Sequence, residues 1–433
     1  MKDISFFKDL MATYNKSSLI LRILVGLVIG VILALLVPGL SWISELGNLF
    51  VGALKGVAPV LVFVLVSSSL SQNSSRLDRR FGTVILLYLS TTLAAAVLAV
   101  FASELFPQTI ALGQVAAEST PAPQGLDEVF HTLLENIVTN PIASISTGNY
   151  IGILFYAVLF GLAMKQVASN TAKEMMKNIA DGVSLIVRWV INLAPFGILG
   201  LIYSTVSNSG LSIFTDYGKL VLSLVGTMLF MALIVSPFFI YLVLHVNPYP
   251  LVFRCLRESG IPAFFTRSSA ANIPVNMELC KKLGLDEDFY SVSIPLGSTI
   301  NMDGAAITIT IMTLATANTL GIHVSIPAAI VLSIVATFAA CGASGVAGGS
   351  LLLIPMACSL FGISQEVAMQ VVGVGFIISV VQDSIETALN SSGDVEFTAT
   401  AEYMQWVKDK KPLPNFLVKG KKTKKEKQKE TFS

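Results

Sequence analysis

The chain contains few charged residues, and long parts of it contain no basic residue at all. Charged residues make up 13% of the sequence, against roughly a quarter in soluble domains. The hydrophobic fraction is 54% and the mean hydropathy is +0.74. Neither Lys nor Arg occurs from Phe81 to Met164, or from Leu283 to Gln405. A soluble core could not hide so much apolar surface, so the composition excludes a soluble protein and indicates a polytopic membrane protein.

Cysteine and histidine are also scarce. The four cysteines have no metal-ligand spacing and the three histidines are scattered, which argues against a zinc or haem site. His131 and His323 fall in external loops or at span ends, and no Ser/His or Cys/His pair is placed for nucleophilic work, so we expect no enzyme. No small-residue cleavage site follows a short apolar core, so we expect no removable signal peptide. Residues 1–17 predict a cytoplasmic interfacial segment instead.

The basic residues occur in clusters. Because positive residues stay on the cytoplasmic side of a membrane, these clusters mark the inside, and the base-free loop Pro107–Asn149 marks the outside. Both termini are then cytoplasmic, with residues 406–433 as a basic tail near anionic lipid headgroups. Nucleic-acid binding by this tail is the weaker alternative. The clusters are Lys2–Arg22, Arg76–Arg80, Lys165–Lys177, Arg254–Arg257, Lys281–Lys282 and Lys408–Lys429.

The first half of the chain, residues 18–245, contains plain apolar runs. A membrane span takes roughly 20 such residues, and six runs alternate in direction when the basic clusters are placed inside. The fourth run can begin earlier, near Asn140. The predicted spans are Leu19–Val37, Leu46–Leu70, Thr83–Leu105, Tyr150–Met164, Val183–Ile202 and Leu220–Leu244.

The second half, residues 246–405, contains broken apolar runs. The first of them has basic residues at both ends and a small, polar centre, which predicts a re-entrant hairpin that enters and leaves on the cytoplasmic side. The third has no charge and a tip at residues 342–349, so a second hairpin can enter from outside. In order, the segments are a hairpin at Phe253–Gly284, a span at Tyr290–Leu320 interrupted at Pro295, Gly297 and Asn301–Gly304, a hairpin at Ile326–Phe361, and a last span at Val367–Ala388 that ends in the polar stretch Asn390–Glu402.

This order, a hairpin and then a broken helix, occurs twice with opposite orientation. Such inverted repeats predict a binding site near the membrane midplane. The predicted fold is therefore all-α and polytopic, with eight transmembrane helices and two re-entrant helical hairpins. The alternative is that the glycines of these segments only allow helices to pack closely.

Four acidic residues lie in the broken segments: Asp303, Asp383, Glu386 and Asp394. At membrane depth a carboxylate costs roughly 2.5–3.5 kcal/mol on insertion scales unless something positive meets it. Since this part of the chain supplies no local base, small cations and a substrate amino group are the natural partners, which indicates a cation-coupled transporter. The alternatives are a structural helix break capped by Asn301 and, for Asp394, an exposed cytoplasmic helix end.

The residues around these acids suit a cation and an amino acid. Asn301-Met302-Asp303-Gly304 offers an amide oxygen, a carboxylate and freed carbonyls, which are the ligands of hard cations. The serine-rich tip of the first hairpin can present N–H groups to a carboxylate, and Arg267 there can balance an acid such as Asp383 when no substrate is bound. On the last span, spacings of three and four place one polar stripe on one helical face: Asp383, Glu386, Thr387, Asn390 and Asp394.

Several motifs, in order along nearly the whole chain, carry a family resemblance: Leu49-Phe50-Val51 with Lys55, Thr266-Arg267-Ser268-Ser269, Asn301-Met302-Asp303-Gly304, Ser344-Gly345-Val346 and Asn390-Ser391-Ser392-Gly393-Asp394. The chain resembles the dicarboxylate/amino-acid:cation symporter (glutamate transporter) family. The resemblance implies a secondary transporter of the bacterial inner membrane and a homotrimer. It also implies elevator-type alternating access, in which the second half and parts of the third span move and the external hairpin closes over the substrate.

The resemblance further implies residue roles. Asp383 would hold the substrate's amino group with the carbonyls of Arg267 and Val346, and Asn390 with the Ser269 backbone would take the α-carboxylate; Ser268, Glu386 and Thr387 complete this set. One Na⁺ would bind Gly297, Asn301, Asn390 and Asp394. A second would bind under the external hairpin, near Thr299, Ala340, Cys341 and Ala343. A third would use Tyr88, Thr91, Thr92, Asn301 and Asp303.

Two departures from the family pattern bear on the substrate. Members that carry acidic substrates have an Arg where this chain has Glu386, and a Thr where it has Ala305. Arg pairs with carboxylates, whereas a carboxylate repels an acidic side chain and accepts a hydrogen bond from a hydroxyl. This predicts import of serine and threonine with inward movement of Na⁺. The alternative is a Glu386 that is turned away from the substrate or protonated.

Besides an intramembrane enzyme, which recovery of chemically unchanged serine would dismiss, two rival functions stay open at this point. The first is a Na⁺- or H⁺-coupled carrier of dicarboxylates or acidic amino acids, against which Glu386 argues. The second is a passive cation channel, whose pore the hairpin tips and the intramembrane acids could line. Uptake against a gradient would exclude simple conduction.

Overall fold

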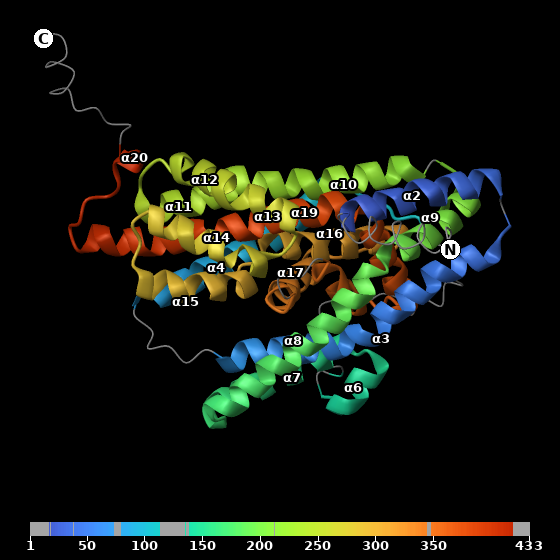
Figure 1. The fold of residues 1–433 in the computed structure, drawn as a ribbon, viewed down its shortest axis with the longest axis horizontal. Helices are drawn as coiled ribbons and strands as arrows, with labels where there is room; N and C mark the ends of the chain where they lie inside the picture. Colours follow the sequence, from blue (N-terminus) through green and yellow to red (C-terminus); the bar gives the residue numbers. More distant parts are fainter. Residues whose placement is uncertain are drawn as a thin grey trace, which may run out of the picture.

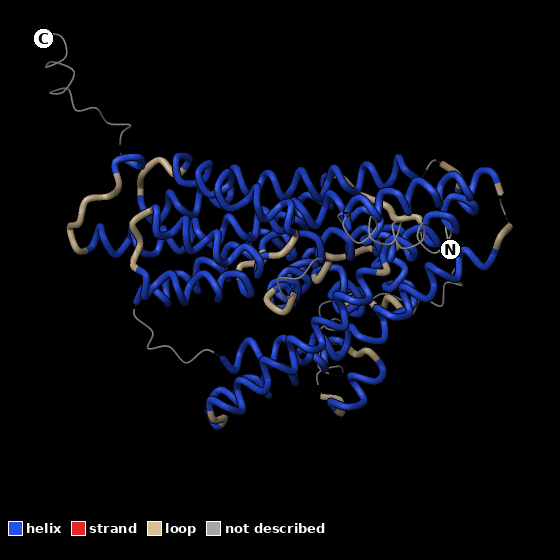
Figure 2. Tube along the Cα trace, in the orientation of Figure 1, coloured by secondary structure: helices blue, strands red, loops and turns tan. Residues whose placement is uncertain are grey.

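A computed structural model describes residues 17, 19–37, 39–72, 79–112, 135, 138–211, 213–343 and 348–418. These residues form helices joined by loops, and none of them lies in a strand (Figure 2). The predicted interfacial segment up to residue 16 and the basic tail from residue 419 lie outside the described residues. For the described part of the chain, the all-helical prediction is confirmed.

A first group of helices comes from the N-terminal half. Its members are α2 (Leu19–Leu36), α3 (Ser41–Gln72), α6 (Pro141–Thr147), α7 (Tyr150–Val167), α8 (Asn170–Asn192) and α9 (Ala194–Ser209). α2 packs along α9, and α3 packs against α7, α8 and α9. In Figure 1, α3, α7 and α8 run obliquely to the remaining helices. Near Asn140, where the fourth span could have begun, the separate helix α6 forms and ends at Gly148, whose φ is 71°.

The fifth predicted span, Val183–Ile202, is bent in the structure. The chain bends by 51° between α8 and α9, at Leu193. Pro195 follows, and it has no N–H to continue the hydrogen bonding of α8. Glycines let neighbouring backbones come close to α9: a Cβ on Gly26 would lie 2.3 Å from the Pro195 carbonyl oxygen, and one on Gly200 would lie 2.4 Å from the Gly47 nitrogen. Small residues of this kind are typical of helix contacts within membranes.

A second group forms the main bundle in Figure 1. It begins with α4 (Arg79–Leu105), α10 (Ile213–Phe230), the π-helix η1 (Met231–Val235), α11 (Ser236–Leu244), α12 (Tyr249–Cys255), the π-helix η2 (Leu256–Gly260), α13 (Ile261–Thr266) and α14 (Ser269–Lys282). The predicted third span is α4, and the sixth is the run from α10 to α11, whose π turn precedes Pro237. The first predicted hairpin is a helix pair that breaks at Arg267 and Ser268.

The second group ends with α15 (Glu287–Ile300), α16 (Asp303–Thr319), α17 (Ile326–Ala340), the 3₁₀ helix η3 (Ser350–Leu353), α18 (Ile354–Ser359), α19 (Gln365–Lys408) and α20 (Asn415–Val418). The predicted break in the seventh span is present at Asn301 and Met302, between α15 and α16. The predicted interruptions at Pro295 and Gly297 are wrong, because α15 continues through both residues. The second predicted hairpin is also a helix pair, and residues 344–347 of its tip lie outside the described residues.

The last predicted span differs most from the structure. Instead of ending near Ala388, α19 runs for 44 residues to Lys408, so the helix after the second hairpin is not broken and the prediction of two broken helices is wrong for this one. The polar residues from Asn390 to Glu402 are buried where α19 packs against α14 and α15. A continuous helix pairs its own backbone groups, which suits such a buried position.

Five described helical segments are long and apolar enough to cross a membrane, or six if the bent α8–α9 pair is one span. Large apolar side chains such as Val28 on α2 and Leu222 on α10 are exposed, which suits contact with lipid or another subunit. In the segment Glu287–Thr319, by contrast, 94% of the residues in the apolar window are buried. The chain is a polytopic membrane protein whose broken helix lies deep inside the bundle.

Candidate substrate and cation site

Two hairpin tips and two helices meet inside the main bundle. α19 packs against α13, α14, α15 and α16, and α15 gives way to α16 at Asn301 and Met302. Asn301 has φ −92° and ψ 84°, outside the helical region, so the backbone hydrogen bonding is interrupted there. The break leaves one helix C-terminus and one helix N-terminus, with their partial charges, next to the polar face of α19.

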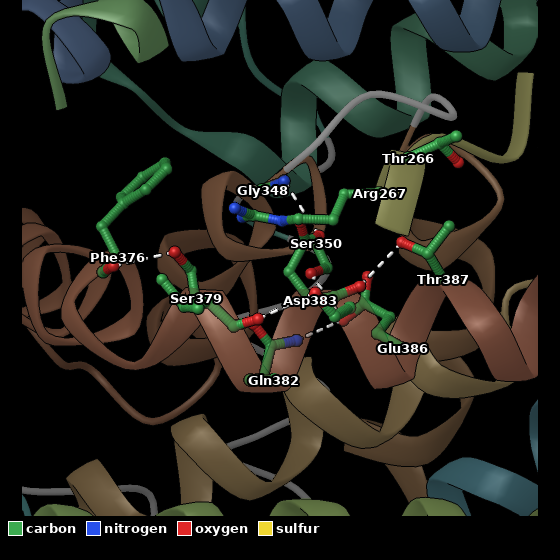
Figure 3. Close-up of polar contacts among 12 residues, drawn as sticks. Thr266, Arg267, Gly348, Ser350, Phe376, Ser379, Gln382, Asp383, Glu386 and Thr387 are labelled. Carbon is green, nitrogen blue, oxygen red and sulfur yellow. Dashed lines mark hydrogen bonds and ion pairs between the residues drawn. The ribbon is translucent and has the colours of Figure 1, made fainter. Parts of the chain in front are cut away.

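Asp383 on α19 contacts both hairpins (Figure 3). Its Oδ2 lies 2.6 Å from Nε of Arg267 in the first hairpin, and its Oδ1 accepts a hydrogen bond from the N–H of Gly348 in the second at 3.0 Å. Arg267 and Asp383 are 6% and 2% exposed. The structure confirms the predicted pairing of this arginine with this acid. Loss of either partner would leave a buried charge uncompensated, which costs about 3–5 kcal/mol.

The first hairpin turns at Arg267 and Ser268. Arg267 has a φ of 52°, an uncommon left-handed conformation for a residue with a side chain. It ends α13, and the Ser268 hydroxyl begins α14 by accepting a hydrogen bond from the Ala271 N–H at 3.2 Å. Ser269, the first residue of α14, is 3% exposed. The predicted substrate residues Ser268 and Ser269 therefore lie at a partly buried helix N-terminus, which attracts anions.

Glu386 lies one helical turn after Asp383 and meets no basic side chain among the described residues. Three neutral donors converge on its Oε2: Thr308 Oγ1 at 2.7 Å, Ser350 Oγ at 2.9 Å and Gln382 Nε2 at 2.5 Å. The labelled side chains of Gln382, Ser350 and Glu386 gather beside Asp383 in Figure 3. Three donors on one oxygen suit an ionised carboxylate, which can only accept.

Gly304 allows the start of α16 to lie directly against α19. Its N–H donates to Asn390 Oδ1 at 2.8 Å, and a Cβ at this position would lie 2.9 Å from the Cα of Glu386. Within the described residues, Asn390 Nδ2 reaches only the sulfur of Met302, at 3.5 Å; sulfur is a weak acceptor. Thr387 Oγ1 donates to a carbonyl one turn back in α19, at 2.7 Å. Asn390 is thus held by its oxygen while its amide donors are almost unused.

Asn301 and Asp394 form a second buried polar centre. Asn301 Nδ2 donates to the Asn390 carbonyl at 3.0 Å and to Asp394 Oδ1 at 3.1 Å. A Cβ on Gly297 would lie 2.8 Å from both Asp394 Oδ1 and Tyr88 OH. Asn301 Oδ1 and Asp394 Oδ2 are buried and accept no hydrogen bond from any described residue. Each such oxygen costs about 1–3 kcal/mol when left unpartnered, and oxygens of this type are the ligands of hard cations.

Asp303 forms a third centre together with α4. Thr92 Oγ1 donates to Asp303 Oδ1 at 3.0 Å, whereas the buried Oδ2 has no partner in the described part of the chain. Tyr88 OH donates to the Asp394 carbonyl at 3.1 Å. The Thr91 hydroxyl, by contrast, donates a hydrogen bond to the Leu87 carbonyl of its own helix, at 2.9 Å. The structure therefore brings Tyr88 and Thr92 to two buried acids, and it leaves the Thr91 side chain bonded within α4.

The C-terminal ends of α15 and α17 lie next to each other. Cys341, which ends α17, has its Sγ 3.5 Å from the carbonyl oxygen of Ile300, the last residue of α15. The predicted cation ligands Thr299, Ala340 and Ala343 belong to these same two chain segments. Two helix C-termini that meet in this way concentrate partial negative charge, which favours a cation.

Sequence reasoning missed some members of the site. Gln382 could have been found, because it precedes Glu386 by four residues on one helix, but Thr308 and Ser350 come from distant segments. Glu396, at 3% exposure, is another buried acid that was not predicted. Among the predicted residues, Val346 lies outside the described part of the chain.

The charge balance of the site agrees with the sequence argument. Asp383 pairs with Arg267, and no described Lys, Arg or His forms an ion pair with the other three predicted acids. Those three acids are Asp303, Glu386 and Asp394, at 1%, 5% and 0% exposure.

Comparison with known proteins defines the family. The model of the Sodium:dicarboxylate symporter family matches residues 19–404. The chain belongs to this family. It is 66% identical over 408 residues to the serine/threonine transporter SstT of Bifidobacterium adolescentis. The aligned residues make up 94% of this chain and 95% of that protein. It is 56% identical over 401 residues to SstT of Streptococcus thermophilus, and the aligned residues make up 93% of this chain and 100% of that protein.

A third relative is SstT of Streptococcus agalactiae, which is 58% identical over 395 residues, or 91% of this chain and 98% of that protein. These relatives and the symporter family are transporters. The family resemblance predicted from the motifs is confirmed, and this symporter-family member is a transporter and not an enzyme.

Proposed function

We propose that this protein imports serine and threonine and couples their uptake to inward movement of Na⁺. The observation that carries the proposal is Glu386, a buried carboxylate surrounded by hydroxyl and amide donors one turn from Asp383. A dicarboxylate would place its second negative charge against this residue. The names of the relatives, serine/threonine transporters, support the same substrate class.

The substrate's ammonium group would bind Asp383. In the structure this carboxylate holds the Arg267 guanidinium at 2.6 Å, so the ammonium replaces one positive charge by another and leaves no carboxylate uncompensated. The carbonyl groups of the two hairpin tips, at Arg267 and Val346, would complete the ammonium site. Replacement of the Arg267 guanidinium by the substrate's ammonium would couple substrate binding to a rearrangement of both hairpins. Arg267 belongs to the first hairpin, and Asp383 also accepts a hydrogen bond from the Gly348 N–H of the second.

The α-carboxylate would bind between Ser269 and Asn390. Ser269 begins α14, where N–H groups and the helix dipole favour an anion, with Ser268 at the helix cap. Asn390 keeps its Oδ1 on Gly304 and has its Nδ2 donors nearly free among described contacts. Thr387, one turn before Asn390 on the same face, borders this region.

The cations would bind where buried oxygens lack partners. Asn301 Oδ1 and Asp394 Oδ2 belong to one proposed site, with the carbonyls of Gly297 and Asn390. Asp303 Oδ2 belongs to another, with Tyr88, Thr91, Thr92 and the Asn301 side chain. The third lies between the ends of α15 and α17, near Thr299, Ala340, Cys341 and Ala343.

The wider arrangement follows from the same proposal. The chain would cross the bacterial inner membrane eight times, with two re-entrant hairpins and both termini in the cytoplasm. Residues 18–245 would be the trimer-forming scaffold, with part of the third span joining the transport core at residues 246–405. The core would move across the bilayer with its cargo while α17, η3 and α18 close over the substrate. The oblique course of α3, α7 and α8 relative to the main bundle supports this division (Figure 1).

Uptake into liposomes containing the purified protein tests the proposal. An inward Na⁺ gradient should drive accumulation of labelled serine, unlabelled threonine should compete with it, and aspartate should not. Equal accumulation under a proton gradient without Na⁺ would refute the coupling ion. Competition by aspartate as strong as that by threonine would refute the substrate class.

A further inference from the structure

Gln382 hydrogen-bonds both Glu386 and Thr308, and Thr308 is itself a donor to the same carboxylate. Gln382 Nε2 lies 2.7 Å from Thr308 Oγ1 and 2.5 Å from Glu386 Oε2, so both amide hydrogens have acceptors. Its Oε1 is buried without a partner among the described residues. The reverse orientation of the amide would turn the carbonyl oxygen toward the carboxylate, where two acceptors repel. The Gln382 side-chain amide is therefore oriented to donate to Glu386, although this orientation leaves Gln382 Oε1 without a partner among the described residues.

The donors of this cluster all meet the same oxygen of Glu386. Thr308 belongs to α16, Ser350 to η3 and Gln382 to α19, and each one donates to Oε2. No described residue donates to Oε1. Because the contacts come from three separate elements, the carboxylate cannot rotate about its last bond without breaking them. One oxygen is thus saturated by the protein, and the other keeps its capacity to accept a hydrogen bond.

We infer that Gln382 is a positioning residue for substrate specificity: with Thr308 and Ser350, it fixes Glu386 so that Oε1 alone accepts the side-chain hydroxyl of the substrate. This inference rests on the proposed uptake of serine and threonine. It has a definite consequence for selectivity. Serine and threonine satisfy Oε1 with their hydroxyl hydrogen, whereas alanine leaves a buried acceptor unpaired and is rejected.

The test compares serine and alanine on the variant Gln382→Met, which keeps the length of the side chain and removes its donors. Inhibition of labelled serine uptake by unlabelled serine and by alanine gives the two apparent affinities. We expect the serine affinity to fall about tenfold, the loss typical of one hydrogen bond to a charged group, while the alanine affinity stays the same. The matched control is Ser379→Ala on the same helix, whose hydroxyl donates only to the Phe376 carbonyl, at 2.8 Å (Figure 3).

A second variant keeps the test decisive if Gln382→Met does not insert into the membrane. Thr308→Val removes another donor to the same oxygen with little change in shape, and it should lower the ratio of serine to alanine affinity in the same direction. An equal fall in both affinities, or an unchanged ratio in a folded variant, would overturn the inference. If the wild-type protein accumulated no serine, the proposed function itself would fail. Failure of the inference about Gln382 would instead appear as normal wild-type uptake with an unchanged affinity ratio in the variants, so the two failures are distinguishable.

Discussion

The two helix groups differ in the residues that they bury. In the first group, α2 and α3 meet α9 through glycines, and no described acidic side chain is buried. In the second group, α16 and α19 bury carboxylates, and two carboxylate oxygens, Asp303 Oδ2 and Asp394 Oδ2, have no partner among the described residues. The first group is suited to hold helices together, and the second carries an energetic cost that a bound cation would lower. Substitutions in the two groups should therefore have separable effects.

Asp383→Asn should have the largest effect on the second group. The amide removes the charge that would hold the substrate's ammonium and leaves Arg267 buried without its partner. We expect serine binding and uptake to be lost, with a fall of more than about 100-fold in affinity. Binding of labelled serine to purified protein measures this, and Asp288→Asn, the same change at an exposed position, is the control. Unchanged uptake by Asp383→Asn would refute the ammonium assignment.

Glu386→Arg combined with Ala305→Thr should redirect the same site. The arginine supplies a bidentate partner for a carboxylate, so we expect aspartate to become the preferred competitor of uptake and serine to weaken by about 10- to 100-fold. Competition assays with both amino acids measure the shift. If serine remained preferred, position 386 would not face the substrate's side chain.

Asp394→Asn should affect the cation more than the amino acid. Asp394 Oδ2 is one of the unpartnered buried oxygens, and its loss should raise the half-saturating Na⁺ concentration about tenfold. Serine affinity at saturating Na⁺ should change little. The exposed Glu366→Gln provides a control with the same loss of charge. A normal Na⁺ dependence in Asp394→Asn would remove this residue from the cation site.

Gly200→Ala should disturb the first group alone. Its added Cβ would lie 2.4 Å from the Gly47 nitrogen, so α3 and α9 must move apart, at a cost of about 1–3 kcal/mol. We expect a lower thermal transition temperature, with serine and Na⁺ affinities unchanged in the protein that remains folded. A large loss of affinity without loss of stability would contradict the separation of the two groups.

Gly182→Ala in the same group should have the smallest effect. An added Cβ there meets no atom within 4 Å, and alanine is favoured over glycine in a helix interior by roughly 0.5–1 kcal/mol. The transition temperature should stay the same or rise slightly. A marked fall would mean that the exposed face of α8 contacts another subunit, which an assay of oligomeric state would show.

The sequence predicted the buried acids well because their chemistry is local. A base-free apolar stretch containing Asp303 and Asp394 is anomalous wherever it folds, and the break at Asn301 follows from residues that are neighbours in the chain. The bend at Leu193 was missed although Pro195 could have indicated it. The length of α19 was also missed, because polar residues such as Thr398 predict an exposed segment unless other helices cover them.

By itself, the sequence determined the membrane class, the family, the helix break and the acids that need positive partners. Each of these depends on the composition or the order of neighbouring residues. Only the tertiary structure decided that Ser350 and Thr308 meet at one oxygen of Glu386, and that Asp383 joins both hairpins. Contacts between residues far apart in the chain depend on how helices pack. Periodicity within one helix shows which of its faces is polar or apolar, but not which other helix covers that face.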